Sequence, residues 1–275
     1  MREIQVILSQ EKVEQLYTEL VDGVRKYFTD HGFSKAVLGL SGGIDSAIVA
    51  CLAKQALGAK NVLAISLPSK YSSQESADYA KALASNLDIQ YSLVSIAEIY
   101  DTYLDVLGKE FHVKEEEDLD IYLQNIQSRI RGNILMAFSN KFGGLVLATG
   151  NKSEALMGYC TLYGDTVGAL AVIADVLKTN VYQLAEYINT DSEVIPGDII
   201  TRHPTAELSP GQKDEDSLPP YEFLDKILYC IGKGKSETEI VLGGSDPSTV
   251  KEVIETIKKT EYKREQCPPG IKTSI

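Results

Sequence analysis

The sequence predicts an α/β protein whose core is a doubly wound parallel sheet flanked by helices. Short apolar runs at residues 37–40, 62–67 and 145–148 alternate with longer segments in which apolar residues recur at helical spacing, the pattern of consecutive βαβ units. The run at 62–67 is apolar on both strand faces, as in a parallel strand that is buried on both sides. We therefore expect a ligand to bind beyond the carboxyl ends of these strands.

The first half of the chain contains helices and strands in alternation. Helical patterns cover residues 10–30, 73–86 and 96–107, and strand patterns cover residues 37–40, 62–67 and 89–94. Ser72 and Glu75 have the spacing of a capping box, which would open the helix at 73–86. Gly32 would end the first helix, because glycine is the usual residue just past a helix C-terminus.

The second half predicts one long helix, a fourth strand and a helical C-terminal part. Helices are expected at 118–142, 179–188, 221–231, 236–242 and 247–260, with a strand at 145–148 and a loop at 157–165. Thr179 is a plausible N-cap for the helix that it begins. Residues 203–220 hold four of the nine prolines, a composition that resists regular structure. We expect 206–218 to be a mobile lid that closes over a bound nucleotide, within a single domain of residues 1–275.

The charge and cysteine content of the chain argue against several classes of function. The chain has 27 Lys and Arg against 39 Asp and Glu, a net charge of −12, which opposes nucleic-acid binding because phosphate backbones need clustered cations. The four cysteines, Cys51, Cys160, Cys230 and Cys267, form no C-x-x-C pair, which argues against a zinc site or a disulfide framework. Without a signal sequence or a long apolar segment, a soluble cytoplasmic protein that does not bind membranes is expected.

The glycine-rich turn at residues 41–46 is the strongest functional signal. It joins the strand at 37–40 to a helical pattern, so the free N–H groups of the new helix form an anion site. The turn matches neither a Walker A loop nor the G-x-G-x-x-G fingerprint. Asp45 would repel a phosphate 4 Å away by about 4 kcal/mol at an effective dielectric near 20. Either Mg²⁺ bridges Asp45 to phosphate, or Asp45 only interacts with the helix dipole.

Other polar residues near strand and helix ends allow two interpretations each. Glu154 follows the strand at 145–148 and could share a metal with Asp45, or it could be an ordinary carboxylate at a helix N-terminus. Lys178 could meet a phosphate or point to solvent. Asn125 and Arg129 recur near helical spacing on the helix at 118–142 and could form a binding face or a hydrated one.

These motifs carry a family resemblance. Residues 41–46, Ser-Gly-Gly-Ile-Asp-Ser, resemble the pyrophosphate-binding loop of the ATP pyrophosphatase (PP-loop) superfamily, whose members split ATP between its α and β phosphates. The segments at 68–73, 125–131, 149–154, 158–165, 204–208 and 262–264 come in the order seen in NAD synthetases. The residues at 158–165, 213–221 and 267–270 resemble those of the synthetase half of glutamine-dependent NAD synthetases.

The resemblance implies an activity and a set of partners. The expected reaction is the ATP-dependent amidation of deamido-NAD (nicotinic acid adenine dinucleotide) to NAD through an adenylated carboxylate, with release of AMP and pyrophosphate. Only about 35 residues precede the first strand, so we expect no amidase domain and a ligase that uses free ammonia or ammonia from a separate glutaminase. Related enzymes are homodimers, and the helix at 118–142 is the candidate interface. The alternatives are another adenylating amidotransferase, such as a GMP synthetase core, or a non-enzymatic ATP-binding module.

The resemblance also assigns residues to roles. It implies ATP contacts from Gly39, Leu40, Ser41, Gly42, Gly43, Ile44, Asp45, Ser46, Thr149, Lys178 and Thr205. It implies deamido-NAD contacts from Asn125, Arg129, Glu154, Tyr159, Cys160, Thr161, Leu162, Tyr262 and Lys263. Mg²⁺ would be held by Asp45 and Glu154, and catalysis would rest on these two and Lys178. Ammonia-dependent enzymes usually have Lys where Leu162 stands and Asp near Ala169, so the resemblance leaves open which residues hold the nicotinic-acid ribose.

Overall fold

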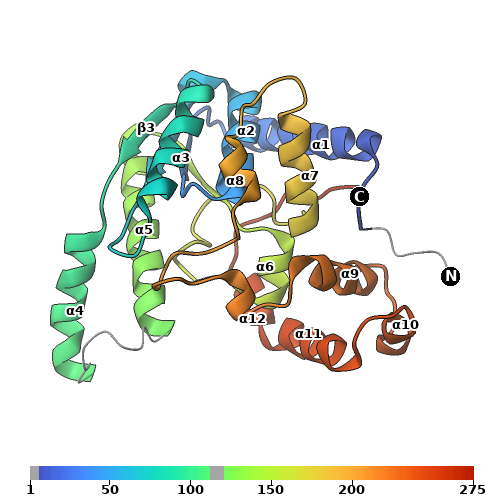
Figure 1. Cartoon of the computed structure of the whole chain (residues 1–275). Helices are drawn as coiled ribbons and strands as arrows, with labels where there is room; N and C mark the ends of the chain where they lie inside the picture. The colour runs from blue at the N-terminus through green and yellow to red at the C-terminus, as the bar shows by residue number, and fades with distance from the viewer. Residues whose placement is uncertain (1–5, 112–120) are drawn as a thin grey trace.

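The core of the protein is a five-stranded parallel sheet with the strand order β3-β2-β1-β4-β5 (Figure 1). The structure is a computed structural model that describes residues 6–111 and 121–275. The strands are β1 (Ala36–Gly39), β2 (Val62–Ser66), β3 (Gln90–Leu93), β4 (Leu145–Ala148) and β5 (Leu170–Ala171). Because β1 pairs with both β2 and β4, the chain builds one half of the sheet and then returns to build the other. The predicted doubly wound architecture is confirmed.

Helices cover both faces of the sheet and its carboxyl edge. They are α1 (Gln10–Asp30), α2 (Ile44–Leu57), α3 (Gln74–Asn86), α4 (Ala97–Phe111), α5 (Ile121–Phe142), α6 (Lys152–Met157), α7 (Lys178–Ile188), α8 (Gly197–Thr201), α9 (Tyr221–Gly232), α10 (Glu237–Leu242), α11 (Pro247–Lys259) and α12 (Glu261–Arg264), with short 3₁₀ turns η1 (Ala59–Asn61) and η2 (Asp214–Asp216). The helices predicted from the sequence are all present. Residues 118–120 of the predicted long helix lie outside the described residues.

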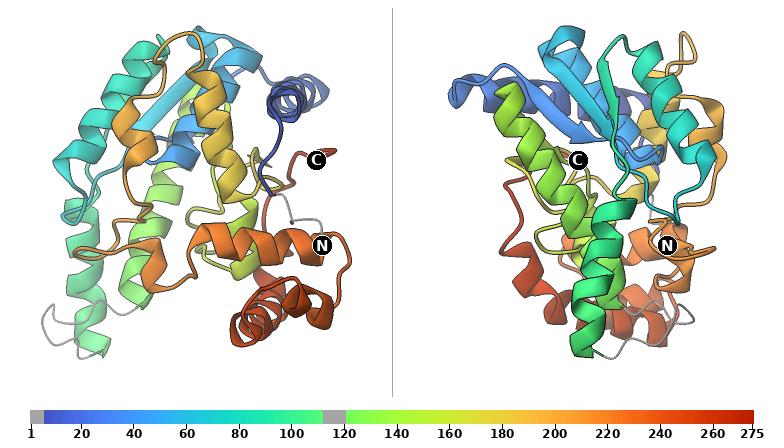
Figure 2. Two further views of the ribbon diagram at one scale, coloured as in Figure 1. Left: turned by 45° about the vertical axis from the view of Figure 1, so that its right-hand side comes forward. Right: turned by 90° about the vertical axis from the view of Figure 1, so that its left-hand side faces the viewer.

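The side chains of β1 alternate between two apolar cores. Ala36 and Leu38 belong to the core beneath α1, α2 and α7, whereas Val37 belongs to the core beneath α4 and α5. This alternation follows from the two-residue period of a strand. Figure 2 shows the two helical layers on opposite sides of the sheet. Within the described residues, no helix combines the length and the apolar character that a membrane span needs.

A third apolar core lies beyond the carboxyl edge of the sheet. Met157 of α6 packs there with buried residues of α9, α10 and α11, such as Leu224, Ile240 and Val253. The segment after α12 returns to the sheet, where the Ala171 N–H of β5 donates to the carbonyl of Pro269 at 2.9 Å. The C-terminal helices therefore form a base under the loops that follow β1 and β4 (Figure 1).

The predicted start of α3 is wrong by one residue. Ser73, not Ser72, is the N-cap, and its hydroxyl accepts the Ser76 N–H. The Ser72 hydroxyl instead accepts the Ser69 N–H at 3.1 Å. Two adjacent serines offer the same chemistry, and the turn after β2 decides which of them caps the helix.

The predicted N-cap of α7 is also wrong. The helix begins at Lys178 with Leu177 as N-cap, and Leu177 makes no side-chain cap. The N–H groups of Lys178 and Thr179 donate to Ser153 of α6 and Asp225 of α9, at 3.0 and 2.8 Å. Distant side chains thus satisfy the exposed N–H groups that a local cap usually satisfies.

Residues 206–218 are more ordered than their composition suggests. Leu218 is buried in the third apolar core, and Asp214 is 4% exposed. The carbonyl of Leu208 accepts from Gln127 of α5 at 2.8 Å. The segment therefore lies against α5 and the C-terminal base.

Candidate active site

The loops after β1 and β4 face each other across the point where the strand order reverses, which is where α/β sheets bind ligands. Two adjoining cavities open there. The larger, about 250 Å³, is lined mainly by the strand ends, α5 and the covering segment; its wall includes Gly39, Leu40, Ser41, Thr149, Ser128, Arg131, Asp165 and Glu207. The smaller, about 180 Å³, is lined by Ser41, Gly43, Ile44, Asp45, Ser46, Thr149, Glu154, Tyr159, Lys178, Thr205 and Asp214, among others. All of the predicted ATP residues except Gly42 thus line one or both of these adjoining cavities.

The glycine-rich turn is held by contacts that only glycine allows. Gly42 has φ +82°, and a Cβ on it would collide with the carbonyl of Ser76 at the start of α3. Inside the turn, the Ser46 hydroxyl donates to the Gly43 carbonyl at 2.9 Å and accepts the Ser41 N–H at 3.3 Å. Left-handed backbone and close approach to α3 both require glycine here.

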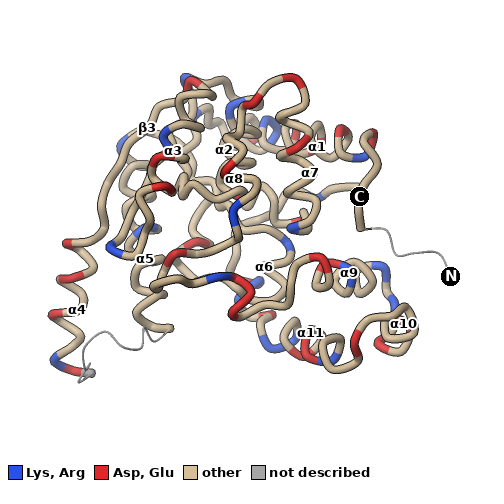
Figure 3. Tube along the Cα trace, in the orientation of Figure 1, with Lys and Arg blue, Asp and Glu red and all other residues tan. Residues whose placement is uncertain are grey.

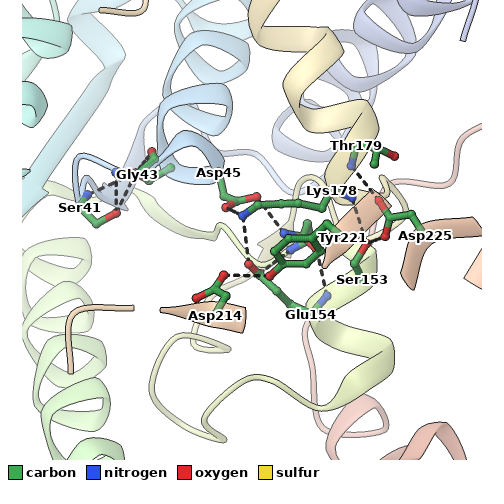
Figure 4. A network of polar contacts seen from close by, with 12 residues as sticks. Ser41, Gly43, Asp45, Ser153, Glu154, Lys178, Thr179, Asp214, Tyr221 and Asp225 are labelled. Carbon is green, nitrogen blue, oxygen red and sulfur yellow. Dashed lines mark hydrogen bonds and ion pairs between the residues drawn. The ribbon is translucent and has the colours of Figure 1, made fainter. Parts of the chain in front are cut away.

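Asp45, Glu154 and Lys178 come together at the floor of the smaller cavity (Figure 4). The Lys178 ammonium contacts Asp45 Oδ2 and lies 3.4 Å from Glu154 Oε1. The lysine side chain is 2% exposed, whereas the two carboxylates are 18% and 17% exposed. The lysine is therefore buried behind the carboxylates, which face the cavity. The three residues predicted to carry catalysis form one ion-pair cluster.

Asn151 joins the two carboxylates from behind. Its amide donates to Asp45 Oδ1 at 2.9 Å, and its carbonyl oxygen accepts the Glu154 N–H at 3.0 Å. Glu154 Oε2 accepts the Asn151 N–H in return, which makes a capping box at the start of α6. One buried residue thus sets the relative position of Asp45 on α2 and Glu154 on α6.

The cluster holds more carboxyl groups than cationic groups. Burial and repulsion from Asp45 raise the pKa of Glu154, although Lys178 opposes this. Burial alone would lower the pKa of Lys178, but attraction to Asp45 and Glu154 outweighs it, so the pKa is raised and the lysine stays protonated. Burial also raises the pKa of Asp214, a third carboxyl beside Lys178. A ligand cation placed here would relieve this excess.

Tyr221 brings the covering segment into the cluster. Its hydroxyl donates to Asp214 Oδ2 at 2.8 Å, and the Lys178 ammonium lies 5.2 Å from the centre of its ring. Burial, followed by the nearby carboxylates Glu154 and Asp214, raises the pKa of the Tyr221 hydroxyl. Asp214 thus reaches the site from a proline-rich acidic segment whose sequence indicated only a mobile loop.

A second ion pair ties the covering segment to the rim of both cavities. Glu207 Oε1 accepts from Ser73 Oγ, Ser76 Oγ and Arg202 Nη2 at 2.8, 2.8 and 2.9 Å. Glu207 holds a positive φ of +48°, which is uncommon for a residue with a side chain. Nothing in the local sequence pattern distinguishes Glu207 or Arg202 as part of the site. Thr205, which was predicted, lines the smaller cavity and accepts the Glu207 N–H at 3.1 Å.

The residues predicted to bind deamido-NAD form a second group between α5 and the loop at 158–165. Thr161 Oγ1 donates to Asn125 Oδ1 at 2.7 Å, and Arg129 donates to the carbonyl of Leu162 at 3.1 Å. The Lys263 ammonium donates to the carbonyls of Gly158 and Cys160 at 2.7 and 2.8 Å. The predicted helix face at Asn125 and Arg129 thus contacts protein rather than only water.

This second group is only partly connected to the cavities. Glu154 and Tyr159 line the smaller cavity, whereas Asn125, Arg129 and the loop residues 160–162 do not. Tyr262 is 53% exposed and lines neither cavity. The structure therefore brings the ATP residues together around a space, and it brings most of the substrate residues together with one another.

Several residues of the site were not predicted from the sequence. Asn151 lies inside the segment 149–154, where its N-cap spacing was a usable signal. Glu207, Asp214 and Tyr221 lie inside the segments 204–208 and 213–221 that carry the family resemblance, but no role was assigned to them, because their roles depend on distant partners. Arg202 lies outside those segments. Across residues 6–111 and 121–275, no group of three or more His, Cys, Asp or Glu side chains is arranged to hold a metal ion.

Comparisons with known proteins agree with this geometry. The family model described as NAD synthase matches residues 16–267. A glutamine-dependent NAD(+) synthetase of Thermotoga maritima is 48% identical over 264 residues, which are 95% of this chain and 45% of that protein. The chain thus spans about half the length of the curated relatives that it matches.

The chain is also similar to solved structures of synthetases. An NH3-dependent NAD synthetase of Campylobacter jejuni is 28% identical with a TM-score of 0.73, over 92% of this chain and 96% of that one. An NMN synthetase of Francisella tularensis is 25% identical with a TM-score of 0.78, over 94% and 97%. Since the family model covers most of the chain, the chain belongs to the NAD synthase family.

Proposed function

We propose that this protein amidates deamido-NAD to NAD at the expense of ATP, with ammonia as the nitrogen donor. The observation that most supports this proposal is the Lys178–Asp45–Glu154 cluster on the floor of a cavity that the glycine-rich turn also lines. Membership of the NAD synthase family supports this reaction, and it leaves the GMP synthetase alternative without support. The proposed reaction is that of an ammonia-dependent NAD synthetase.

In this proposal the substrate carboxylate is activated before ammonia attacks. A carboxylate oxygen of deamido-NAD attacks the α-phosphorus of ATP, and pyrophosphate leaves. Ammonia then attacks the acyl carbon, AMP departs with the carboxylate oxygen, and the nitrogen loses a proton. We assign the residues around the smaller cavity to positioning and charge stabilisation.

We assign each part of this reaction to residues of the chain. The N–H groups of the turn at 41–46, at the start of α2, would bind the leaving pyrophosphate. Lys178 would stabilise the charge that develops on it, because a buried ammonium acts in a water-poor site. Thr149 and Thr205, which line the smaller cavity, would hold further phosphate oxygens. The apolar strand ends of the larger cavity would take the adenine ring.

We propose Asp45 and Glu154 as the protein ligands of Mg²⁺. The fit rests on the charge excess: two carboxylates converge on the cavity with a third, Asp214, beside one ammonium. Mg²⁺ is commonly held by one or two carboxylates together with substrate phosphates rather than by a protein cage, which agrees with the donor set here. The ion would neutralise charge on the pyrophosphate.

Replacement of Asp45 by asparagine tests this assignment. Asn keeps the size of the side chain and removes one negative ligand, so we expect the concentration of Mg²⁺ needed for half-maximal activity to rise by about tenfold or more. Asp175→Asn, which affects a carboxylate paired with Lys152 at 2.8 Å, is the control. If Asp45→Asn kept the Mg²⁺ dependence of the unchanged protein, Asp45 would not be a ligand.

We propose that residues 206–218 act as a lid over the nucleotide. Polar contacts such as Glu207 with Arg202 and Asp214 with Tyr221 hold the segment closed. These contacts would break when it opens, whereas Leu218 at its end would stay in the third apolar core. ATP is expected to slow proteolytic cleavage within 206–218 by about tenfold. Cleavage sites mapped by mass spectrometry check this. Equal cleavage with and without nucleotide would remove the lid from the proposal.

We also propose a homodimer. Ile99, Tyr103 and Val106 are 42%, 46% and 61% exposed, and their spacing places them on one face of α4, between acidic residues visible along that helix in Figure 3. α4 lies beside α5, the helix whose sequence indicated an interface. We expect light scattering to give twice the mass of the 30.1 kDa chain, and Val106→Asp to give the monomer. A monomer in both proteins would contradict the dimer.

A single assay tests the central proposal. The protein is incubated with ATP, Mg²⁺ and deamido-NAD, with either ammonium or glutamine, and NAD and AMP are measured. We expect equimolar NAD and AMP with ammonium. Nicotinic acid mononucleotide, the acceptor whose amidation would give NMN, serves as the competing substrate. ATP binding without any amide product would favour the non-enzymatic alternative.

A further inference from the structure

Asp225 of α9 is a buried carboxylate that the proposed mechanism does not use. It is 0% exposed. Its Oδ1 accepts from Ser153 Oγ at 2.5 Å, and its Oδ2 accepts the Thr179 N–H at 2.8 Å. These partners are neutral, and no ion pair to Asp225 is found among the described residues. Burying a charge is unfavourable unless its hydrogen bonds are satisfied. The two hydrogen bonds to Ser153 and Thr179 therefore hold this carboxylate in a defined position.

The two partners of Asp225 are the chain neighbours of two residues in the ion-pair cluster. Ser153 precedes Glu154 on α6, and Thr179 follows Lys178 on α7. Ser153 Oγ also accepts the Lys178 N–H at 3.0 Å, so one hydroxyl connects Asp225 to the lysine itself. Figure 4 shows this set beside the cluster of Lys178, Asp45 and Glu154.

Asp225 also provides the negative charge at the N-terminus of α7. This helix has 11 residues, and a carboxylate at its first turn interacts favourably with the helix dipole. Lys178 is the first residue of α7, so the position of its backbone follows the position of that helix end. Three helices, α6, α7 and α9, meet at this one side chain.

We infer that Asp225 is a positioning residue for the reaction: by binding Ser153 and the Thr179 N–H together, it holds the Lys178 ammonium between Asp45 and Glu154. The inference rests on the proposed function for its effect on turnover. It also makes a claim about the position of Lys178 that can be tested without an activity assay. Without the Asp225 charge, the start of α7 moves relative to α6 and the ammonium leaves its carboxylates.

Asp225→Asn is the principal variant, and Asp246→Asn is its matched control. Asp246 accepts the Thr249 N–H at 2.9 Å and the Ser248 hydroxyl at 2.5 Å at the start of α11, the same pair of donor types. α11 contributes no residue to either cavity. Ser153→Ala, which keeps the Asp225 charge and removes only the shared hydroxyl, is the second variant in case Asp225→Asn does not fold.

The first readout is chemical labelling of lysines by an acetylating reagent, quantified residue by residue. Lys178 is buried and paired, so it should label slowly in the unchanged protein and in Asp246→Asn. In Asp225→Asn its labelling rate is expected to rise by about tenfold or more, because a freed amine regains its ordinary reactivity. Lys35, which donates to the Phe142 carbonyl at 3.3 Å on the far side of the sheet, reports global unfolding and should not change.

The second readout is the kinetics of NAD formation. Asp225→Asn is expected to lower kcat by about tenfold to a hundredfold, the effect of a misplaced catalytic group, and to change the KM for ATP by less than about threefold. Ser153→Ala should lower kcat in the same direction, and the double variant should be no worse than Asp225→Asn alone. A purely structural role predicts a lower Tm with kcat unchanged.

The outcomes separate the two claims. Unchanged Lys178 labelling in a folded Asp225→Asn protein and in Ser153→Ala overturns the positioning role. Faster Lys178 labelling with kcat unchanged also overturns it. If the unchanged protein makes no NAD, the proposed function fails, and the labelling alone still decides whether Asp225 holds Lys178 in place.

Discussion

Replacement of Lys178 by methionine is expected to lower kcat by about a hundredfold to a thousandfold, the usual loss when one preorganised charge at a developing anion is removed. Methionine fills nearly the same volume, so the buried part of the side chain still packs. What is lost is the ammonium that contacts Asp45 and lies 3.4 Å from Glu154. Steady-state kinetics of NAD formation at saturating ATP check this result.

The same substitution is expected to lower the free energy of unfolding by about 1–3 kcal/mol. Loss of one partner of a buried ion pair costs about 3–5 kcal/mol, and the 17–18% exposure of the two carboxylates reduces that figure because water solvates them. Added Mg²⁺ should restore part of the stability, since the cation would replace the lost positive charge. Urea unfolding with and without Mg²⁺ measures both effects.

Lys152→Met is the matched control for Lys178→Met. Lys152 is the first residue of α6 and pairs with Asp175 at 2.8 Å, yet it lines neither of the two nucleotide cavities. It should lose stability without losing more than about threefold in kcat. Equal losses of kcat in both variants would mean that Lys178 supports the structure rather than the reaction.

Replacement of Gly42 by alanine is expected to abolish ATP binding in the micromolar to millimolar range. The new Cβ would collide with the carbonyl of Ser76, and the backbone would have to keep a φ of +82°. The left-handed conformation costs about 1–2 kcal/mol for a residue with a side chain, and the collision displaces either the turn or the start of α3. Calorimetric titration with ATP and thermal unfolding measure the two effects.

Gly32→Ala separates the collision from the backbone strain. Gly32 has φ +73° after α1, and a Cβ there would meet no atom within 4 Å. It should cost about 1–2 kcal/mol of stability and leave ATP binding unchanged. If Gly42→Ala behaved like Gly32→Ala, the contact with α3 would have no importance for the nucleotide site.

The sequence predicted the framework of the site because that framework is local. The turn at 41–46 follows one strand and begins one helix, so glycine, serine and helix periodicity are enough to identify it. Strand and helix alternation also predicted the parallel sheet. Only β5 was missed, because two residues carry no usable period.

Predictions of helix starts failed where distant side chains replaced local caps. Thr179 had the residue type of an N-cap, but Ser153 and Asp225 bind the N–H groups at the start of α7. The sequence placed Asp214 in the predicted lid, but its burial and its contact with Tyr221 became visible only in the structure. Local composition cannot report a partner on another helix.

By itself, the sequence determined that the chain forms a doubly wound sheet with a glycine-rich turn after its first strand, and its ordered motifs indicated the family. Only the tertiary structure decided that Lys178 lies between Asp45 and Glu154, 133 and 24 residues away along the chain. The physical reason is that strand order and helix docking set these contacts. A carboxylate has the same local pattern whether it faces water, a metal or a buried lysine, and Asp45 of the glycine-rich turn acquires its counter-charge, Lys178, only when α7 packs against α2.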